Sequence, residues 1–70
     1  MIDTVTKVIE LVGESPKSWE DAIQNAVAKS AKSVDGISGV EVLNLTARVE
    51  EGKLVEYKAN VKVAFPVMDR

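Results

Sequence analysis

The stretch VEVLNLTARVEEGKLVEYKANVKVAF, residues 40–65, decides the fold of this chain. Its second half alternates apolar and polar residues, which is the pattern of a β-strand with one buried face and one wet face. The apolar positions are Val55, Tyr57, Ala59, Val61, Val63 and Phe65. The first half alternates in the same way, and its apolar face is formed by Leu43, Leu45, Ala47 and Val49. The segment EEGK at 50–53 lies between the halves, and Gly52 supplies the positive φ that a short turn needs. The stretch is therefore predicted to be a β-hairpin.

Ahead of the hairpin, the β-branched segment TVTKVIELV at 4–12 predicts another strand. Apart from Lys7 and Glu10, both of its sides are mostly apolar. A strand partly covered on both faces has this composition, and a contact within an oligomer is one way to cover the second face. The segment GESPK at 13–17 is predicted to end this strand.

A helix is predicted to follow, with Ser18 as its N-cap and acidic side chains in its first turn. Apolar residues recur every three or four positions from Trp19 to about Val34 and form one stripe. Gly36 is predicted to be the left-handed C-cap, and residues 37–39 to link the helix to the hairpin. Pro66 is expected to end strand pairing, since it has no N–H to donate.

The predicted order is thus β-α-β-β over a single domain, residues 1–70, in the α+β class. We expect one helix packed on a curved antiparallel three-stranded sheet, with the first strand beside the last. Strands of roughly ten residues span about 33 Å, whereas a helix of about seventeen residues spans only ~26 Å. One helix cannot cover such a sheet, so the sequence predicts self-association.

Composition excludes several classes of function. Nine basic and eleven acidic side chains leave a net charge of −2, without a run of Lys or Arg that would attract nucleic acid. No apolar run reaches membrane-spanning length, and a cytoplasmic location is the default expectation. The chain has no cysteine and no histidine, so the common nucleophile–base pairs and transition-metal clusters cannot form. An enzyme is not expected.

Three local features allow a functional and a purely structural interpretation. Residues 13–18 offer Gly, Lys and Ser before a helix, but they lack the P-loop spacing and also fit a capped turn. Glu50-Glu51 could hold a hard cation or be a solvated hairpin tip. Trp19 could stack on a ligand, or pack against the sheet or a neighbouring subunit.

Several strings, in order and spacing, resemble the dodecin family. They are VIELVG at 8–13, SPKSWEDA at 15–22, NAVA at 25–28, VEV at 40–42, EGK at 51–53 and residues 57–65. The resemblance covers about residues 5 to 66. It implies a β-α-β-β protein that assembles as a hollow dodecamer and binds flavins, such as FMN or riboflavin, in pairs at subunit interfaces without catalysis.

The resemblance also locates the family's flavin pocket. In flavin-binding members a tryptophan just ahead of the Glu-Val of the second strand stacks on the isoalloxazine ring, and that position is Gly39 here. A glutamine on the last strand, after the position of Tyr57, hydrogen-bonds the flavin, and Lys58 takes its place. Neither role transfers. Lys58 could attract a phosphate or carboxylate, or it could be a solvated lysine on the wet face of a strand.

Two hypotheses about function follow from these features. The first is a dodecin-like binding and storage protein that forms a homo-oligomeric shell. The alternative is a structural shell without flavin, or one that binds a cation or another anion.

Overall fold

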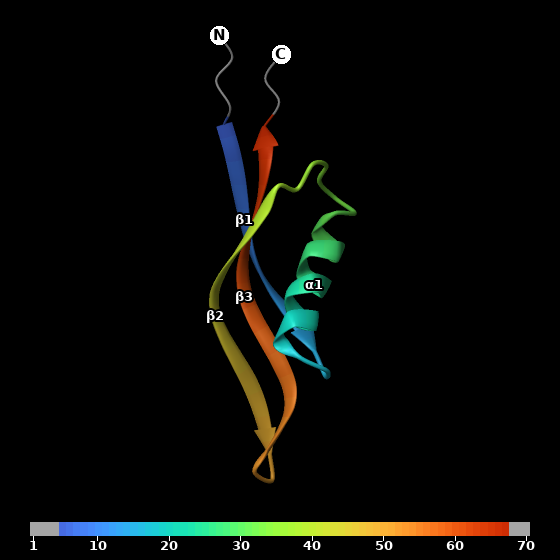
Figure 1. The fold of residues 1–70 in the computed structure, drawn as a ribbon, viewed down its shortest axis with the longest axis vertical. Coiled ribbons are helices and arrows are strands. Elements are labelled where there is room, and N and C mark those ends of the chain that lie inside the picture. Colours follow the sequence, from blue (N-terminus) through green and yellow to red (C-terminus); the bar gives the residue numbers. More distant parts are fainter. Residues whose placement is uncertain (1–4, 68–70) are drawn as a thin grey trace.

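The computed structural model describes residues 5–67 and confirms the β-α-β-β order (Figure 1). The elements are β1 (Val5–Ser15), α1 (Trp19–Ser30), β2 (Gly39–Glu50) and β3 (Lys53–Val67). The strands form one antiparallel sheet in the order β1-β3-β2, so the first strand lies beside the last, as predicted. Helix α1 packs mainly on β1 and β3. The face of the sheet that contacts α1 is called the inner face below, and the opposite face the outer face.

The hairpin turn is confirmed at residues 50–53. β2 ends at Glu50 and β3 begins at Lys53, and Gly52 has the expected positive φ of 78°. Glu51 also has a positive φ, of 52°. A two-residue turn with positive φ at both central positions follows the right-handed twist of the strands, but it disfavours a residue with a Cβ at the first position.

Strand β2 contains a bulge that simple alternation did not predict. Val42 lies opposite Val61, but Asn44 already lies opposite Asn60, so Leu43 is an extra residue without a partner. Because of this shift, Val40 and Val42 share the inner face with Leu45, which lies opposite Ala59. The prediction that Leu43 belongs to the paired apolar face with Leu45 is wrong, since a bulge interrupts the period of two.

Strand β1 does not end at Gly13, as the sequence analysis predicted, but continues to Ser15. Gly13 is buried on the inner face opposite Ala59. A Cβ there would overlap the carbonyl oxygen of Ala22 and lie 3.0 Å from the Cβ of Ala26. Glycine is therefore needed here because the helix backbone approaches the strand closely, and not because the strand breaks.

Helix α1 begins as predicted and ends earlier than predicted. The Ser18 hydroxyl accepts a hydrogen bond from the Asp21 N–H at 3.0 Å, which is the N-cap geometry. The helix ends at Ser30 with Ala31 as its C-cap, short of Val34. After the helix, backbone hydrogen bonds between residues three apart, from Lys32 to Lys29 and from Ser33 to Ser30, form a tighter turn. Gly36 has the predicted positive φ of 72°, but it lies in the connection to β2 and does not cap the helix.

Pro66 also differs from its prediction, because β3 continues through it to Val67 and Pro66 lies opposite Thr6 of β1. β2 begins only at Gly39, opposite Ala64, so β3 is paired on one side beyond that point. A proline without an N–H is compatible with a strand segment that has one open side.

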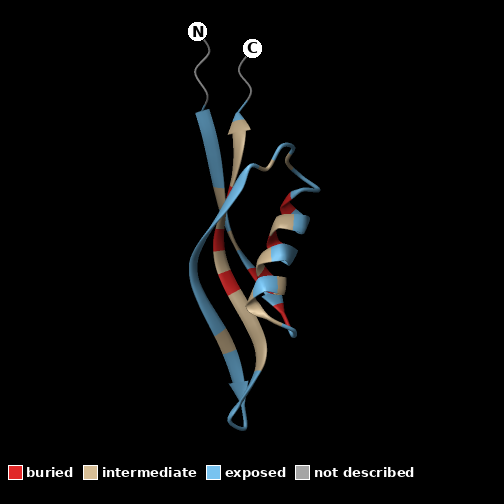
Figure 2. Ribbon diagram, viewed as in Figure 1, coloured by how far each residue is buried: buried red, intermediate tan, exposed pale blue. Residues whose placement is uncertain are grey.

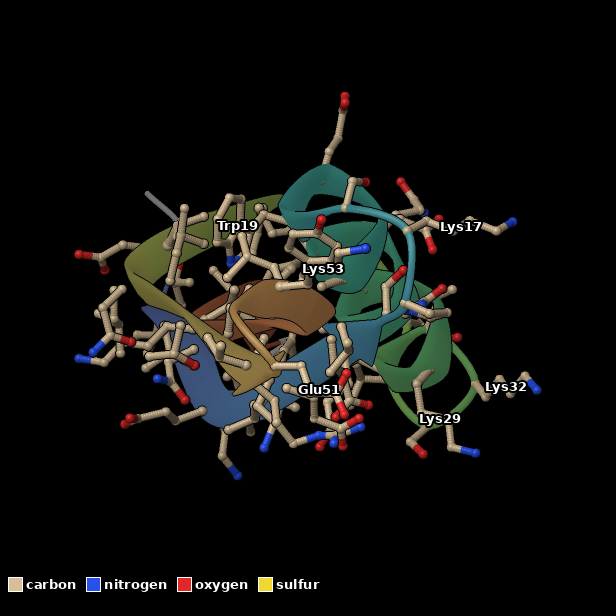
Figure 3. The ribbon with its side chains drawn as sticks, turned by 90° about the horizontal axis from the view of Figure 1, so that it is seen from below. Lys17, Trp19, Lys29, Lys32, Glu51 and Lys53 are labelled. Atoms are coloured by element: carbon tan, nitrogen blue, oxygen red, sulfur yellow. The ribbon has the colours of Figure 1, made fainter. Side chains whose placement is uncertain are left out.

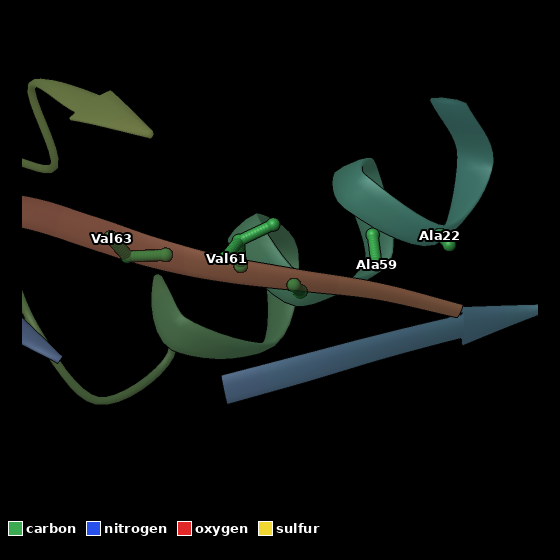
Figure 4. Packing of buried hydrophobic residues seen from close by; sticks show 5 residues of the cluster. Ala22, Ala59, Val61 and Val63 are labelled. Atoms are coloured by element: carbon green, nitrogen blue, oxygen red, sulfur yellow. The ribbon is translucent and has the colours of Figure 1, made fainter. Parts of the chain in front are cut away.

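The core is small. Its buried apolar residues are Ala22, Ala26, Ala59, Val61 and Val63, so within residues 5–67 no buried side chain is larger than valine (Figures 2 and 4). A twelve-residue helix is about 18 Å long, while the fifteen residues of β3 span about 50 Å. The chain measures 57 × 20 × 13 Å, with a radius of gyration of 14.7 Å. A compact chain of this length has a radius of gyration of about 11 Å, so this protein is elongated.

Replacing Gly13 with alanine should lower the free energy of unfolding by about 1–3 kcal/mol, because the helix must move away from the strand. Chemical denaturation at fixed protein concentration measures the loss. The matched control is Gly39→Ala, since a Cβ at Gly39 meets nothing within 4 Å. Equal stability of the two variants would contradict the close helix–strand approach.

Replacing Glu51 with asparagine should raise the free energy of unfolding by about 0.5–1 kcal/mol, because asparagine tolerates the positive φ better. The shift of the denaturation midpoint measures this gain. Glu51→Gln is the control, because it removes the same charge without favouring the left-handed conformation. A similar gain in both variants would assign the effect to charge.

Candidate ligand-binding face

The two positions of the predicted pocket, Gly39 and Lys58, lie on the outer face of the sheet. Successive side chains of β3 point to opposite faces of the sheet. Ala59 and Val61 are buried on the inner face, so Lys58, which directly precedes Ala59, points to the outer face. Gly39 is paired with Ala64, which lies an even number of residues from Lys58 in β3 and therefore points to the same face. Both positions are therefore on the side of the sheet away from α1.

One copy of the chain does not bring Gly39 and Lys58 together. Lys58 is paired with Thr46, whereas Gly39 is paired with Ala64, six residues farther along β3. Six strand residues span about 20 Å. A pocket that uses both positions would therefore have to form between two copies, each supplying one of them.

Gly39 leaves its part of the outer face open, since no atom lies within 4 Å of a Cβ built there. The chain has one Trp, one Tyr and one Phe. Tyr57 and Phe65 alternate along β3 in step with its inner residues, so both lie on the inner face. Trp19 contacts Tyr57 edge-on, with ring centroids 4.9 Å apart. No aromatic ring on the outer face is thus available to stack on a flavin.

Trp19 packs against the sheet, which confirms one of the two interpretations of this residue. Its indole Nε1 donates a hydrogen bond of 2.7 Å to the carbonyl oxygen of Thr46 in β2. Figure 3 labels this side chain in a view from the end of the molecule that carries the hairpin turn. Through this bond and the contact with Tyr57, the first helical residue is fixed to β2 and β3.

Lys58 is half-buried. It is paired with Glu14 of β1 on one side and with Thr46 of β2 on the other. In the described part of the chain, both ion pairs belong to Arg48, and Lys58 forms neither. The ammonium group of Lys58 is therefore available to an anion, while the solvated state remains the alternative.

The remainder of the outer face is polar and carries both signs of charge. The side-chain amide of Asn60 donates a hydrogen bond to the side-chain oxygen of Asn44. Lys62 is paired with Glu10 of β1 and with Glu41 of β2. The sequence analysis did not find the amide pair, because the bulge at Leu43 sets which residues lie opposite each other.

The hairpin tip carries a different arrangement of charge. Arg48 bonds to the carboxylate of Glu50 and lies 3.5 Å from that of Glu56. The hydrogen bond and charge of Glu50, with a smaller effect of Glu56, raise the pKa of Arg48 above its usual value. Glu50 thus already has a cationic partner, which disfavours the cation site considered at Glu50-Glu51. Within residues 5–67, no three His, Cys, Asp or Glu side chains gather to hold a metal ion.

The segment before the helix is a capped turn and not a phosphate cradle. The Ser15 hydroxyl donates to Asp21 at 2.6 Å and accepts from the Lys17 N–H at 2.9 Å. Ser18 is engaged as the N-cap, so both hydroxyls are already bonded to the protein. Among the described residues, the structure contains no helix of the length and apolarity needed to cross a bilayer.

Comparisons with known proteins identify relatives along almost the whole chain. The family model described as Dodecin matches residues 5–68. A calcium dodecin from Mycobacterium tuberculosis is 36% identical over 62 residues, covering 89% of this chain and 87% of the relative. A dodecin from Thermus thermophilus is 34% identical over 61 residues, covering 87% and 88%.

Solved structures agree with this result. A protein from Thermus thermophilus superposes with a TM-score of 0.92 at 31% identity, covering 97% of this chain and 100% of the other. The calcium dodecin of Mycobacterium tuberculosis, described as having a novel calcium-binding site, superposes with a TM-score of 0.79 at 34% identity and 91% coverage of both chains. The sequence matches and the shared fold show that this chain belongs to the dodecin family of small, non-enzymatic ligand-binding proteins.

Proposed function

We propose that this protein is a self-assembling binding and storage protein whose copies form a hollow dodecamer and hold a small ligand between them. The observation that carries the proposal is the large surface of the single chain. The chain exposes 5303 Å². A compact folded monomer of 7.6 kDa exposes only about 4300 Å².

The excess of about 1000 Å² is close to the roughly 800 Å² that each partner buries in a standard stable interface. Much of it is apolar, since ten large apolar side chains are exposed in the described part of the chain. Self-association would remove this surface from water, and it would supply the burial that the small core lacks.

The separation of Gly39 and Lys58 supports a ligand site that is completed by a second copy. The chemistry at these positions does not favour flavin, because Gly39 offers no ring and Lys58 replaces the hydrogen-bonding amide. We therefore propose that riboflavin and FMN bind weakly or not at all, and that Lys58 favours another anionic small molecule.

A cation is the second candidate ligand, and the observation that favours it is the similarity to the calcium dodecin of Mycobacterium tuberculosis. One copy lacks a cluster of three acidic ligands within residues 5–67. Glu10, Glu14 and Glu41 all share the outer face. Carboxylates from neighbouring copies could therefore converge only in the assembly, where calcium would find several oxygens. The cytoplasmic location stays a prediction.

The purified protein should sediment as one species of many times 7.6 kDa, with twelve copies as the proposed number, at micromolar concentration. Analytical ultracentrifugation measures the mass, and dilution tests whether the melting temperature depends on assembly. A compact, cooperatively melting particle of 7.6 kDa would contradict the proposed shell.

The double variant Gly39→Trp with Lys58→Gln should gain flavin affinity. One stacking contact contributes about 1–3 kcal/mol, so the dissociation constant should fall by about one to two decades. Quenching of riboflavin and FMN fluorescence measures it. The control is Gly39→Leu with Lys58→Gln, which adds apolar bulk without a ring. Equal affinity of the two double variants would show that these positions do not form the pocket.

The same preparations separate the two candidate ligands. If the wild-type protein leaves flavin fluorescence unchanged but melts at a higher temperature with calcium, the cation is favoured over the anion. A rise with inorganic phosphate that disappears in Lys58→Gln favours the anion instead.

A further inference from the structure

The connection between α1 and β2 contains a pair of residues that the proposed function does not use, Asp35-Gly36. This is the only place in the sequence where an aspartate or an asparagine is followed by glycine. The connection leaves the end of α1 and returns to the sheet at the start of β2 (Figure 1). Asp35 and Gly36 are both exposed and lie outside helix and strand, so water reaches them in the single chain.

Within residues 5–67, the reactive atoms of this pair are not held by other groups. The Gly36 N–H donates no hydrogen bond, and the Asp35 carboxylate takes part in no hydrogen bond or ion pair. Gly36 has a φ of 72°, and a Cβ built on it would meet only the ring of Pro66, at 3.7 Å. Because glycine has no side chain, nothing on Gly36 itself shields its backbone nitrogen.

The other aspartate and asparagine side chains in the described part of the chain are held in place. In α1, Asp21 accepts a hydrogen bond from the Ser15 hydroxyl at 2.6 Å, and the Asn25 amide donates to the carbonyl oxygen of Glu14 at 2.9 Å. On the sheet, Asn60 bonds to Asn44. Asp35 therefore differs from them both in its freedom to move and in the residue that follows it.

We propose that Asp35-Gly36 is a modification site, at which Asp35 converts spontaneously to isoaspartate in the folded protein. The inference goes beyond the proposed function and does not depend on assembly or on a ligand. The Gly36 nitrogen attacks the side-chain carboxyl carbon of Asp35, and the new N–C bond closes a five-membered succinimide. The nitrogen gives up its proton and the carboxyl group gives up its hydroxyl, so one water molecule leaves.

Water then opens the succinimide at either of its two carbonyl carbons. Opening at the side-chain carbonyl restores aspartate, whereas opening at the backbone carbonyl gives isoaspartate. The water that left in the first step is regained in the second, so the product has the same mass as the original chain. No oxidant, reductant or cofactor takes part.

Isoaspartate lengthens the connection by one backbone atom, because the chain then runs through the Asp35 Cβ. The connection is fixed on both sides of this point. The Val34 N–H donates to the carbonyl oxygen of Ser30 at 3.0 Å, and the Ser38 N–H donates to that of Ala64 at 2.9 Å. The extra length is thus confined to residues 35–37, and we expect the pairing of β2 with β3 to be retained.

Incubation of the full-length protein in warm neutral buffer, followed by trypsin, tests the inference. Cleavage after Lys32 and Arg48 releases residues 33–48, and electron-transfer fragmentation distinguishes isoaspartate from aspartate in this peptide. Isoaspartate at position 35 should form at a rate within about tenfold of that in a free peptide of residues 33–48, since an unbonded connection opens at little cost. The same peptide contains Asn44, which should stay unmodified in the folded protein. If the free peptide forms isoaspartate at position 35 and the folded protein does not, the inference is wrong.

Two variants at position 35 test the chemical route. Asp35→Glu should form no comparable product, because its side chain would have to close a six-membered ring, which is slower. Asp35→Asn should form the same succinimide faster than the wild type, with ammonia as the leaving group. Asp35 is exposed and bonds to no other side chain in the described residues, so both variants should fold, and circular dichroism checks this. An Asp35→Asn protein that forms isoaspartate no faster than the wild type would overturn the succinimide route.

Discussion

The close approach of α1 to β1 at Gly13 is the contact on which the rest of the structure depends. Only a residue without a Cβ lets the Ala22 carbonyl come this near to the strand. Ala22 and Ala26 of the helix belong to the same buried cluster as Ala59 of β3. Small residues on both sides give a short distance between helix and sheet, and they also give a thin core. The protein thus gains close packing but little buried apolar volume.

The thin core explains the elongated shape of the molecule. One short helix lies beside the C-terminal part of β1 and the middle of β3, and β3 extends beyond it at both ends (Figure 1). The uncovered parts of the sheet, including the inner side of β2, stay in contact with water in a single copy. In a larger protein a second helix would cover this surface. In this seventy-residue chain, the proposed assembly would place other copies over this surface.

The outer face of the sheet carries side chains that lie outside the hydrophobic core. Dodecin relatives include a protein named for calcium, and this chain shares their backbone at about a third of sequence identity. On the outer face of this chain, Gly39 leaves open space and Lys58 carries a positive charge. Side chains on a rigid sheet can be exchanged without disturbing the contact between Gly13 and the helix, so ligand preference is free to change while the fold is retained.

The sequence by itself determined the features that depend on neighbours in the chain. These are the order of the elements, the helix start at Ser18, the positive φ of Gly52 and the family resemblance. Tertiary structure decided the features that depend on distant residues. The bulge at Leu43 places Leu45 on the same face as Val40 and Val42, and Gly13 is required because α1 lies against it. The distance between Gly39 and Lys58 likewise follows from strand register. Local patterns report the preferences of a segment, whereas register and close approach are set by long-range packing, which no short stretch of sequence contains.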